Sequence, residues 1–448
     1  MATTSAPTST SPSWAATSND VDPTAIDLCD IARYQDHGYP WAEFAWLRDH
    51  APVFRHATDT SPPFWAITRH ADVLEVHSRP DIFINGGPIL RMDSTTGLDA
   101  LARQRQRNAE RYGWDPDEPF DLVYKDRPEH LDFRTITMRR FTPRAMRSFE
   151  DHLAELARTH VASFVERLQS GDVVDLVAEL STPVPLATIC GLLDIDTSMW
   201  TSLNQWTNVL FEPGVGHEFA RAGESLTELR RRLGQEYFDF REQLLAERRA
   251  NPGDDMVSAL VEATIDGEPL TQQQLHGYLN LLISAGNETT RNAITGGVMA
   301  FAEDVEARRA FTARPAEHIE TAVEEILRWT SPVVQFARTA TADCELAGNS
   351  IRAGDTVVLW YPSANRDATV FDKPERFDVA RDPNFHLAFG HGHHFCLGAN
   401  LARWEMRAVF AELAPWLDSI EIAGPPDVAH HLHVHSYRSL PVRLAGTA

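Results

Sequence analysis

The chain has 448 residues, of which 43% are hydrophobic and 23% are charged, a balance typical of a globular protein with a large buried core. Acidic residues outnumber basic residues by 64 to 41, and the formal net charge of -23 disfavours nucleic acid and anionic membrane surfaces as partners. The four cysteines, Cys29, Cys190, Cys344 and Cys396, form no CxxC pair, which argues against a disulfide framework and suits a reducing cytoplasm.

The first 20 residues are rich in Ser, Thr, Ala and Pro and have neither a basic start nor an apolar run. They are predicted to form a disordered tail rather than a signal or an anchor. Residues 21–448 contain no linker-like stretch and no internal repeat, so we expect a single domain there. Because no run of about 18 apolar residues occurs, the sequence predicts no membrane anchor.

Helical periodicity dominates the chain and predicts a mainly α fold with small β-sheets. Apolar residues recur at helical spacing in 319–327 and again in 402–410. Within 85–129, Gly, Pro, Asp and Arg interrupt any regular spacing of apolar residues, so a long loop with short helices is expected. Further predicted elements are strands at 64–68 and 356–360 and long helices near 145–168, 218–249 and 271–300.

The most informative segment is Phe389-Gly-His-Gly-His-His-Phe-Cys396-Leu-Gly398, where three glycines surround one cysteine just before a predicted helix. Glycine lets a backbone approach another group closely. A sulfur at the N-terminal end of a helix meets unpaired N–H groups, which favour thiolate over thiol. The segment therefore predicts a metal ligand or a nucleophile at Cys396.

Three interpretations of this loop remain open on the residues alone. A buried structural cysteine leaves the three glycines unexplained. Zinc bound by Cys396 with His391, His393 and His394 would need ligands less tightly bunched and a second ligand pair. An axial thiolate to haem iron would use the glycines to lie flat against a planar cofactor.

The pattern F-G-x-G-x-H-x-C-x-G resembles the haem-binding loop of the cytochrome P450 family, and it is formed here by Phe389, Gly390, Gly392, His394, Cys396 and Gly398. Three further motifs match in the same order, so the resemblance covers essentially everything after the tail. It implies the cytochrome P450 fold, haem b (heme b, iron protoporphyrin IX) as cofactor and Cys396 as the iron ligand. It also implies that Phe389, Gly390 and Gly398 contact the cofactor.

The segment Leu281–Thr290 places a carboxylate and hydroxyls in an otherwise apolar helix. Thr289 is positioned to donate its hydroxyl to the carbonyl of Ala285, and Gly286 weakens the same turn, so the helix is predicted to widen and admit water. A lone threonine is as often simply tolerated in a helix. The segment is similar to the oxygen-binding helix of the family, which implies that Ala285 lies beside haem and that Glu288 and Thr289 deliver protons.

Glu325 and Arg328 lie three residues apart on one helix face. An exposed pair with this spacing would contribute little to stability. The match to the E-x-x-R motif of the family implies instead a buried structural network, with Arg376 as its third member.

His130 and Arg134 lie four residues apart and would share a helix face, as expected for two cations that bind one anion. The spacing alone is a weak signal. It is similar to the family's propionate-binding helix, and Arg338 and His394 match two further propionate anchors. Many family members have Arg where this chain has His394, so we expect a pH-dependent bond there.

The chain has no flavin domain and no strand followed by G-x-G-x-x-G, so the electrons are expected from another protein, a ferredoxin with its NAD(P)H-dependent reductase. A basic cluster offers a docking surface. A scattered solvated face explains the same residues equally well. The cluster consists of Arg139, Arg140, Arg144 and Arg147, with Arg403 and Arg407 on the helix after Cys396.

The resemblance implies a hydrophobic substrate over the iron, walled by the helix around Ala285 and by Val333, Val334, Gln335, Val434 and His435. The predicted function is that of a monomeric, cytoplasmic haem-thiolate monooxygenase that inserts one atom of O2 into a C–H bond of a terpenoid, steroid or lipid. A non-catalytic sensor or carrier of a gas or lipid is the alternative, which the acid and alcohol pair disfavours. A peroxide-using variant is disfavoured for the same reason.

Overall fold

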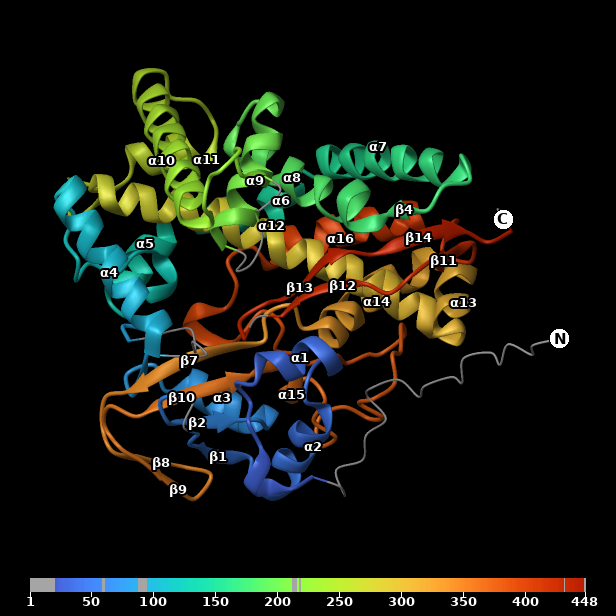
Figure 1. Cartoon of the computed structure of the whole chain (residues 1–448), viewed down its shortest axis with the longest axis horizontal. Coiled ribbons are helices and arrows are strands. Elements are labelled where there is room, and N and C mark those ends of the chain that lie inside the picture. The colour runs from blue at the N-terminus through green and yellow to red at the C-terminus, as the bar shows by residue number, and fades with distance from the viewer. Residues whose placement is uncertain are drawn as a thin grey trace.

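The structure is a computed structural model that describes residues 21–58, 61–87, 95–147, 149–211, 216, 219–430 and 432–446. The tail predicted for residues 1–20 lies outside the described residues. Figure 1 shows a helix-rich part above a smaller part that contains the largest β-sheet, with one long helix crossing the molecule between them.

The described chain is mainly helical, as predicted. The first helices are α1 (Ile31–His37), α2 (Trp41–His50), α3 (His70–Ser78), α4 (Thr95–Tyr112), α5 (Glu129–Met138), α6 (Pro143–Arg147), α7 (Glu150–Gln169) and α8 (Pro183–Leu193). The later helices are α9 (Trp200–Phe211), α10 (Leu226–Ala250), α11 (Met256–Glu262), α12 (Gln272–Glu303), α13 (Val305–Ala313), α14 (Pro315–Thr330), α15 (Tyr361–Ala364) and α16 (Ala399–Leu413). Two short 3-10 helices are used below. They are η5 (Arg139–Phe141), which follows α5, and η9 (Gly392–His394), which lies in the loop just before Cys396.

The largest sheet has the strand order β1-β2-β10-β7-β3 and includes both strands expected from the sequence. Its strands are β1 (Val53–His56), β2 (Phe64–Ile67), β3 (Phe83–Ile84), β7 (Gln335–Ala340) and β10 (Thr356–Trp360). Strands β2 and β10 pair in parallel, whereas the other neighbours are antiparallel. The smaller sheets contain β4 (Val174–Asp175), β5 (Thr264–Ile265), β6 (Glu268–Pro269), β8 (Cys344–Leu346), β9 (Asn349–Ile351), β11 (Ile420–Ile422), β12 (Asp427–His430), β13 (His435–Ser439) and β14 (Pro441–Leu444).

The prediction of only short helices within 85–129 is wrong, because α4 alone has 18 residues. Its sequence is rich in Ala, Arg, Gln and Leu, which have high helix propensity. Most of the described side chains in α4 remain at least partly exposed, so the helix carries no strong apolar period for sequence analysis to detect.

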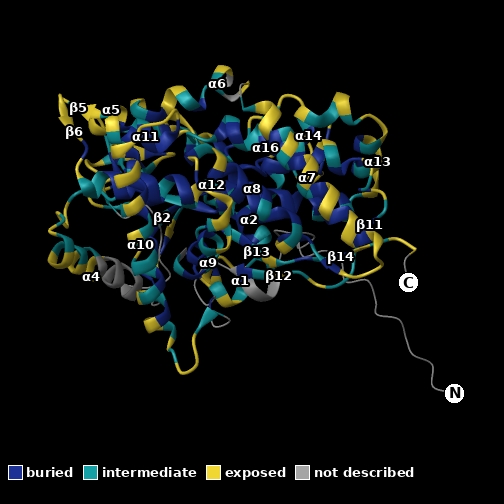
Figure 2. Cartoon of the chain, turned by 90° about the horizontal axis from the view of Figure 1, so that it is seen from above, coloured by how far each residue is buried: buried dark blue, intermediate teal, exposed yellow. Residues whose placement is uncertain are grey.

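Helix α12 forms the centre of the helical part and is buried over most of its length (Figure 2). It packs against α8, α14 and α16. The predicted widening near Gly286 is absent, because residues 272–303 are α-helical without interruption. Gly286 serves close packing instead, since a Cβ there would lie 2.5 Å from Cδ1 of Ile189 in α8.

None of the helices in the described part of the chain is both long and apolar enough to cross a membrane.

Glu325 and Arg328 form a fully buried ion pair on α14, with Arg328 Nε 2.7 Å from Glu325 Oε2. Arg328 Nη2 also donates to Glu325 Oε1 over 2.8 Å. The third member is Arg381, whose Nε donates to Glu325 Oε2 over 3.0 Å and whose side chain is almost buried. The assignment of Arg376 to this position is therefore corrected. Its side chain is 49% exposed and pairs with Glu306, and only its backbone carbonyl accepts from Arg328.

We predict that Arg381→Gln lowers the free energy of unfolding by about 1.5–3 kcal/mol, because it removes a hydrogen bond between buried charged groups. The matched change Arg376→Gln should cost less than about 1 kcal/mol, since it breaks an exposed ion pair. Urea denaturation of the two variants measures both values. Equal losses would contradict the assignment of Arg381.

Candidate functional site

The loop before α16 is shaped by two glycines in the left-handed region, Gly390 with φ 68° and Gly392 with φ 69°. A Cβ on Gly392 would also lie 3.0 Å from the carbonyl oxygen of His77, so both the conformation and the space favour glycine. The backbone N–H of Cys396 donates to the carbonyl of Phe389 over 2.9 Å and closes the loop. These constraints hold Cys396 in place.

Burial raises the pKa of the Cys396 thiol above its usual value. The backbone N–H of Gly398 and the positive charges of Arg134 and Arg403 lower the pKa in part, without overcoming the burial. The prediction that the N-terminus of α16 favours thiolate over thiol stays a prediction, because burial acts against the charged form while Gly398, Arg134 and Arg403 act for it. A metal ion that binds the sulfur would deprotonate the thiol directly.

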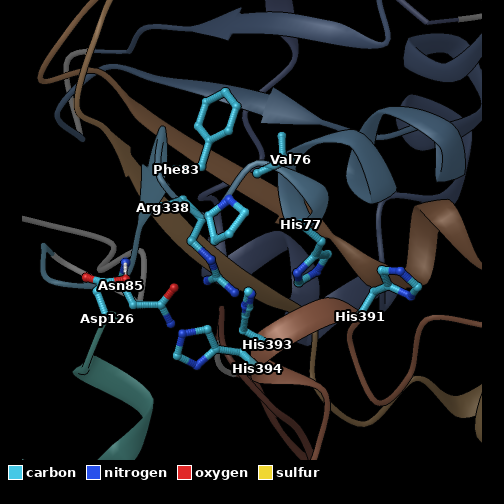
Figure 3. A pocket seen from close by; sticks show the side chains of 10 residues that line it. Val76, His77, Phe83, Asn85, Asp126, Arg338, His391, His393 and His394 are labelled. Carbon is cyan, nitrogen blue, oxygen red and sulfur yellow. Dashed lines mark hydrogen bonds between the residues drawn. The ribbon is translucent and has the colours of Figure 1, made fainter. Parts of the chain in front are cut away.

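Basic and imidazole side chains from distant segments surround a small cavity beside this loop (Figure 3). Arg338 extends from β7 into this region, and His394 and His393 reach it from η9. The remaining lining residues are Val76, His77, Pro80, Phe83, Asn85, Asp126 and His391.

Arg338 is buried, and no carboxylate in the described residues lies within ion-pair distance of it. Among the described residues, its guanidinium makes one hydrogen bond, from Nη1 to the carbonyl of Ala337 over 2.8 Å. A buried cation without an anion is costly, so this position fits an anionic group of a ligand. The Nε2 atom of His130 is also buried without a partner among the described residues.

His130 and His394 lie with their ring centroids 4.1 Å apart, so the structure brings two predicted anchors together. Burial lowers the pKa of His130 to about 4 and that of His394 to about 2, so both rings are neutral at pH 7. The expectations that His130 is a cation and that the bond from His394 depends on pH stay predictions for the haem-bound protein, because a propionate beside either ring would raise its pKa.

Arg134 lies beside this cluster, near enough for its charge to lower the pKa of His130. Its Nη2 donates to the carbonyl of Phe395 over 2.8 Å, next to Cys396, and it does not line the cavity with Arg338 and His394. The predicted role of Arg134 as a propionate anchor therefore has no support in this arrangement. It instead contributes positive charge near the sulfur.

Helix α12 presents the predicted acid and alcohol. Ala285 is exposed although most of α12 is buried, and Thr289 donates its hydroxyl to the Ala285 carbonyl over 2.8 Å. The Thr289 oxygen therefore keeps its lone pairs to accept a hydrogen bond. Glu288 lies 3.8 Å from Nη2 of the buried Arg291, which also bonds Ser436. This contact keeps the Glu288 carboxylate next to Thr289 on α12.

The five residues predicted to wall a substrate pocket lie in three different settings. Val333 is partly exposed and forms an isolated β-bridge with Val434. Val334 and Gln335 are fully buried, and Val334 packs in a core cluster with Phe44 and Trp360, so they do not line an open surface. His435 packs against Tyr39 and Tyr437, with ring centroids 4.9 Å away in both cases.

Sequence reasoning missed His77 and Asp126. Burial lowers the pKa of His77 well below its usual value, and the ring lies near the hydroxyl of Tyr361. Asp126 accepts hydrogen bonds from the backbone N–H groups of Asn85 and Gly86 and so orders the edge of the cavity. Neither residue belongs to a local motif, so only the folded chain reveals them, by packing α3 against η9 and by bringing Asp126 to Asn85.

Comparison with known proteins decides the family. A Cytochrome P450 family model matches residues 317–413, and a methyl-branched lipid omega-hydroxylase of Mycobacterium tuberculosis is 37% identical over 409 residues, covering 89% of this chain and 90% of the relative. The chain belongs to the cytochrome P450 family.

Other relatives of this P450 agree with the assignment. Linalool 8-monooxygenase of Pseudomonas putida is 34% identical, covering 85% of this chain and 89% of the relative. A steroid C26-monooxygenase of Mycobacterium bovis is 35% identical, with coverage of 90% and 89%. A cytochrome P450 of Mycobacterium marinum solved with pseudoionone has a TM-score of 0.79 and 32% identity, covering 95% of this chain and 100% of that one.

This P450 is thus a haem-thiolate monooxygenase with haem as its cofactor, and the cavity residues fit that group. The buried Arg338 offers a cation for a propionate, and His394 and His130 offer neutral imidazoles. Cys396 offers the sulfur ligand. When bound through a thiolate, haem iron activates O2 for insertion into a C–H bond.

We predict that Arg338→Gln stabilises the haem-free protein but weakens haem binding. The haem-free variant should resist urea better than the haem-free parent, because it no longer buries a cation without an anion. The haem-loaded variant should release haem about 10- to 100-fold faster, since it loses charge-assisted hydrogen bonds of about 1.5–3 kcal/mol. Haem transfer to apomyoglobin measures the release rate, with the exposed Arg352→Gln as control. Unchanged haem release would contradict the assignment.

Proposed function

We propose that this P450 hydroxylates a hydrophobic small molecule of the branched-lipid, steroid or terpenoid class. The observation that carries the proposal is the exposed Ala285 on α12, and the apolar Val333, which is partly exposed and bridges to Val434, agrees with it. Apolar walls bind apolar ligands and exclude water. The relatives support the same substrate classes, since they include a lipid omega-hydroxylase, a linalool monooxygenase and a steroid monooxygenase.

The direct test titrates the ferric protein with methyl-branched fatty acids, sterols and monoterpenes and follows the Soret band. A substrate that displaces water from the iron should shift the band to shorter wavelength, and turnover with a ferredoxin, its reductase and NAD(P)H should then give a hydroxylated product. Absence of product from every compound that shifts the band would contradict the proposal.

We assign proton delivery to Thr289 and Glu288. Because the Thr289 hydroxyl donates to Ala285, its oxygen is oriented as an acceptor and can hold a proton donor in place. Glu288 is the adjacent carboxylate, and it lies 3.8 Å from Nη2 of Arg291. The two residues together can therefore position and pass protons at the exposed face of α12.

Thr289→Ala should uncouple oxygen consumption from product formation. NAD(P)H oxidation should continue while most of the reducing equivalents appear as hydrogen peroxide, because the acceptor on α12 is gone. The matched variant Thr289→Ser keeps the hydroxyl and should remain coupled. A product-to-NAD(P)H ratio in Thr289→Ala equal to that of the parent enzyme would rule out the assigned role.

We propose further that the electrons come from an acidic ferredoxin that docks beside the cysteine loop. Helix α6 packs against α16, and Asn400 at the start of α16 donates to the carbonyl of Phe141 in η5. Phe395, next to the cysteine, is 38% exposed. The exposed residues around these elements combine charge and apolar area, namely Arg139, Arg144 and Arg147 with Leu131 and Met138.

Three arginines of the original cluster contribute less to this surface. Arg140 donates to the carbonyl and carboxylate of Asp254. Arg403 forms two hydrogen bonds with Glu324 and stacks over Phe389 at 4.5 Å. Arg407 lies 3.7 Å from Glu320. Their charges are largely compensated within the fold.

The double variant Arg139→Glu/Arg144→Glu should slow ferredoxin-driven turnover at least about tenfold at low salt, because like charges would then oppose the partner. Peroxide-driven turnover should be unchanged. Arg309→Glu on the exposed surface of α13 serves as the charge-matched control. Equal loss of both activities, or equal loss in the control, would contradict docking at this surface.

A further inference from the structure

His77 is a buried imidazole in the wall of the cavity that Arg338 enters, and it belongs to no sequence motif (Figure 3). It lies in the last turn of α3 and is 7% exposed. Its main chain lies directly against the cysteine loop, because a Cβ on Gly392 would be 3.0 Å from the His77 carbonyl oxygen. The ring is close to the same loop, since a Cβ on Gly390 would be 3.8 Å from Cε1 of His77. His77 is therefore fixed beside the segment that presents Cys396.

Tyr361 determines which nitrogen of the His77 ring carries a proton. The Tyr361 hydroxyl lies 3.3 Å from His77 Nε2, and burial raises the pKa of Tyr361 to about 12, so its O–H remains a donor. A buried donor needs an acceptor, and among the described residues this hydroxyl has His77 Nε2 as its partner. In the neutral ring the proton is therefore on Nδ1. If a nearby anion makes the ring a cation, Nδ1 keeps that proton.

The Nδ1 atom of His77 has no hydrogen-bond acceptor in the part of the chain that the structure describes. Burial lowers the pKa of His77 well below its usual value and the charge of Arg338 lowers it further, so the two side chains are close. The carboxylate in the cavity wall, Asp126, already accepts the backbone N–H groups of Asn85 and Gly86. A buried N–H donor and a buried cation thus line one small cavity, as two groups that bind the same carboxylate should.

We propose that His77 donates a hydrogen bond from Nδ1 to the haem propionate that pairs with Arg338, and that Tyr361 is the positioning residue that orients the ring. The cysteine loop and β7 supply the other groups around this cavity, His394 and Arg338. His77 adds a contact from α3, which is distant from both in sequence. Helix α3 is therefore tied to the cofactor as well as to the loop.

The test compares haem-loaded His77→Phe with the parent, since phenylalanine keeps a ring of similar size and removes the donor. Haem transfer to apomyoglobin should be about 10- to 100-fold faster, because a hydrogen bond to a charged group is lost. The resonance Raman band of the propionate bending mode should shift, which a purely structural change in α3 would not cause. His77→Asn places an amide N–H near the position of Nδ1 and should restore most of the parent's retention of haem.

Two variants at Tyr361 separate this hydrogen bond from the effect of a buried hydroxyl left without a partner. Tyr361→Phe should release haem only about twofold faster, because the proton is then shared between the two ring nitrogens. The double variant His77→Phe/Tyr361→Phe, which has no such hydroxyl, should release haem as fast as His77→Phe.

His50→Phe, at an exposed histidine of α2, is the matched control and should behave as the parent. The red-shifted Soret band of the carbon monoxide complex reports that each variant is folded and loaded. Parent-like release and an unshifted propionate band in His77→Phe would overturn the proposal. Parent-like release in the double variant would do the same, because it would assign the effect to the Tyr361 hydroxyl.

Discussion

The buried ion pair of Glu325 and Arg328 is the interaction on which the position of the cysteine loop depends. The guanidinium of Arg328 donates to the carbonyls of Asn365, Pro374 and Arg376, so one side chain holds three points of the chain that leads to the loop. The side chain of Asn365 then accepts from the N–H of Leu387, just before Phe389. Removal of the Glu325 carboxylate would leave the Arg328 guanidinium buried and uncompensated, at a cost of about 3–5 kcal/mol.

The charge distribution around the site reverses that of the whole chain. The net charge is -23, yet Arg338 and Arg134 lie beside the cysteine loop. The sulfur and the cavity thus lie in a positive region, which suits an anionic cofactor and a thiolate ligand. Burial opposes every one of these charges, because it lowers the pKa of Arg338 and Arg134 and raises that of Cys396. Ligand binding, which pairs these charges, therefore provides stabilisation that the protein alone lacks.

Features encoded within one short segment could be predicted from the sequence. The cysteine loop, the hydroxyl of Thr289 bonded to Ala285 and the pairing of Glu325 with Arg328 all follow from local spacing along a loop or a helix. Features that depend on three-dimensional proximity could not. Arg381 and Arg376 lie five residues apart in the same loop, and only the folded chain shows which side chain reaches Glu325. The roles of His77 and Asp126 and the turn of Arg134 toward Phe395 are of the same kind.

The central claim is that the sulfur of Cys396 is the axial ligand of haem iron. The most direct measurement is the absorption spectrum of the reduced, carbon monoxide-bound protein and of its Cys396→His variant. The account predicts a strongly red-shifted Soret band in the parent, since a thiolate donates electron density to the iron, and its replacement by an ordinary imidazole-type band in the variant. A parent spectrum without the red-shifted band, or a variant spectrum identical to a red-shifted parent, would contradict the claim.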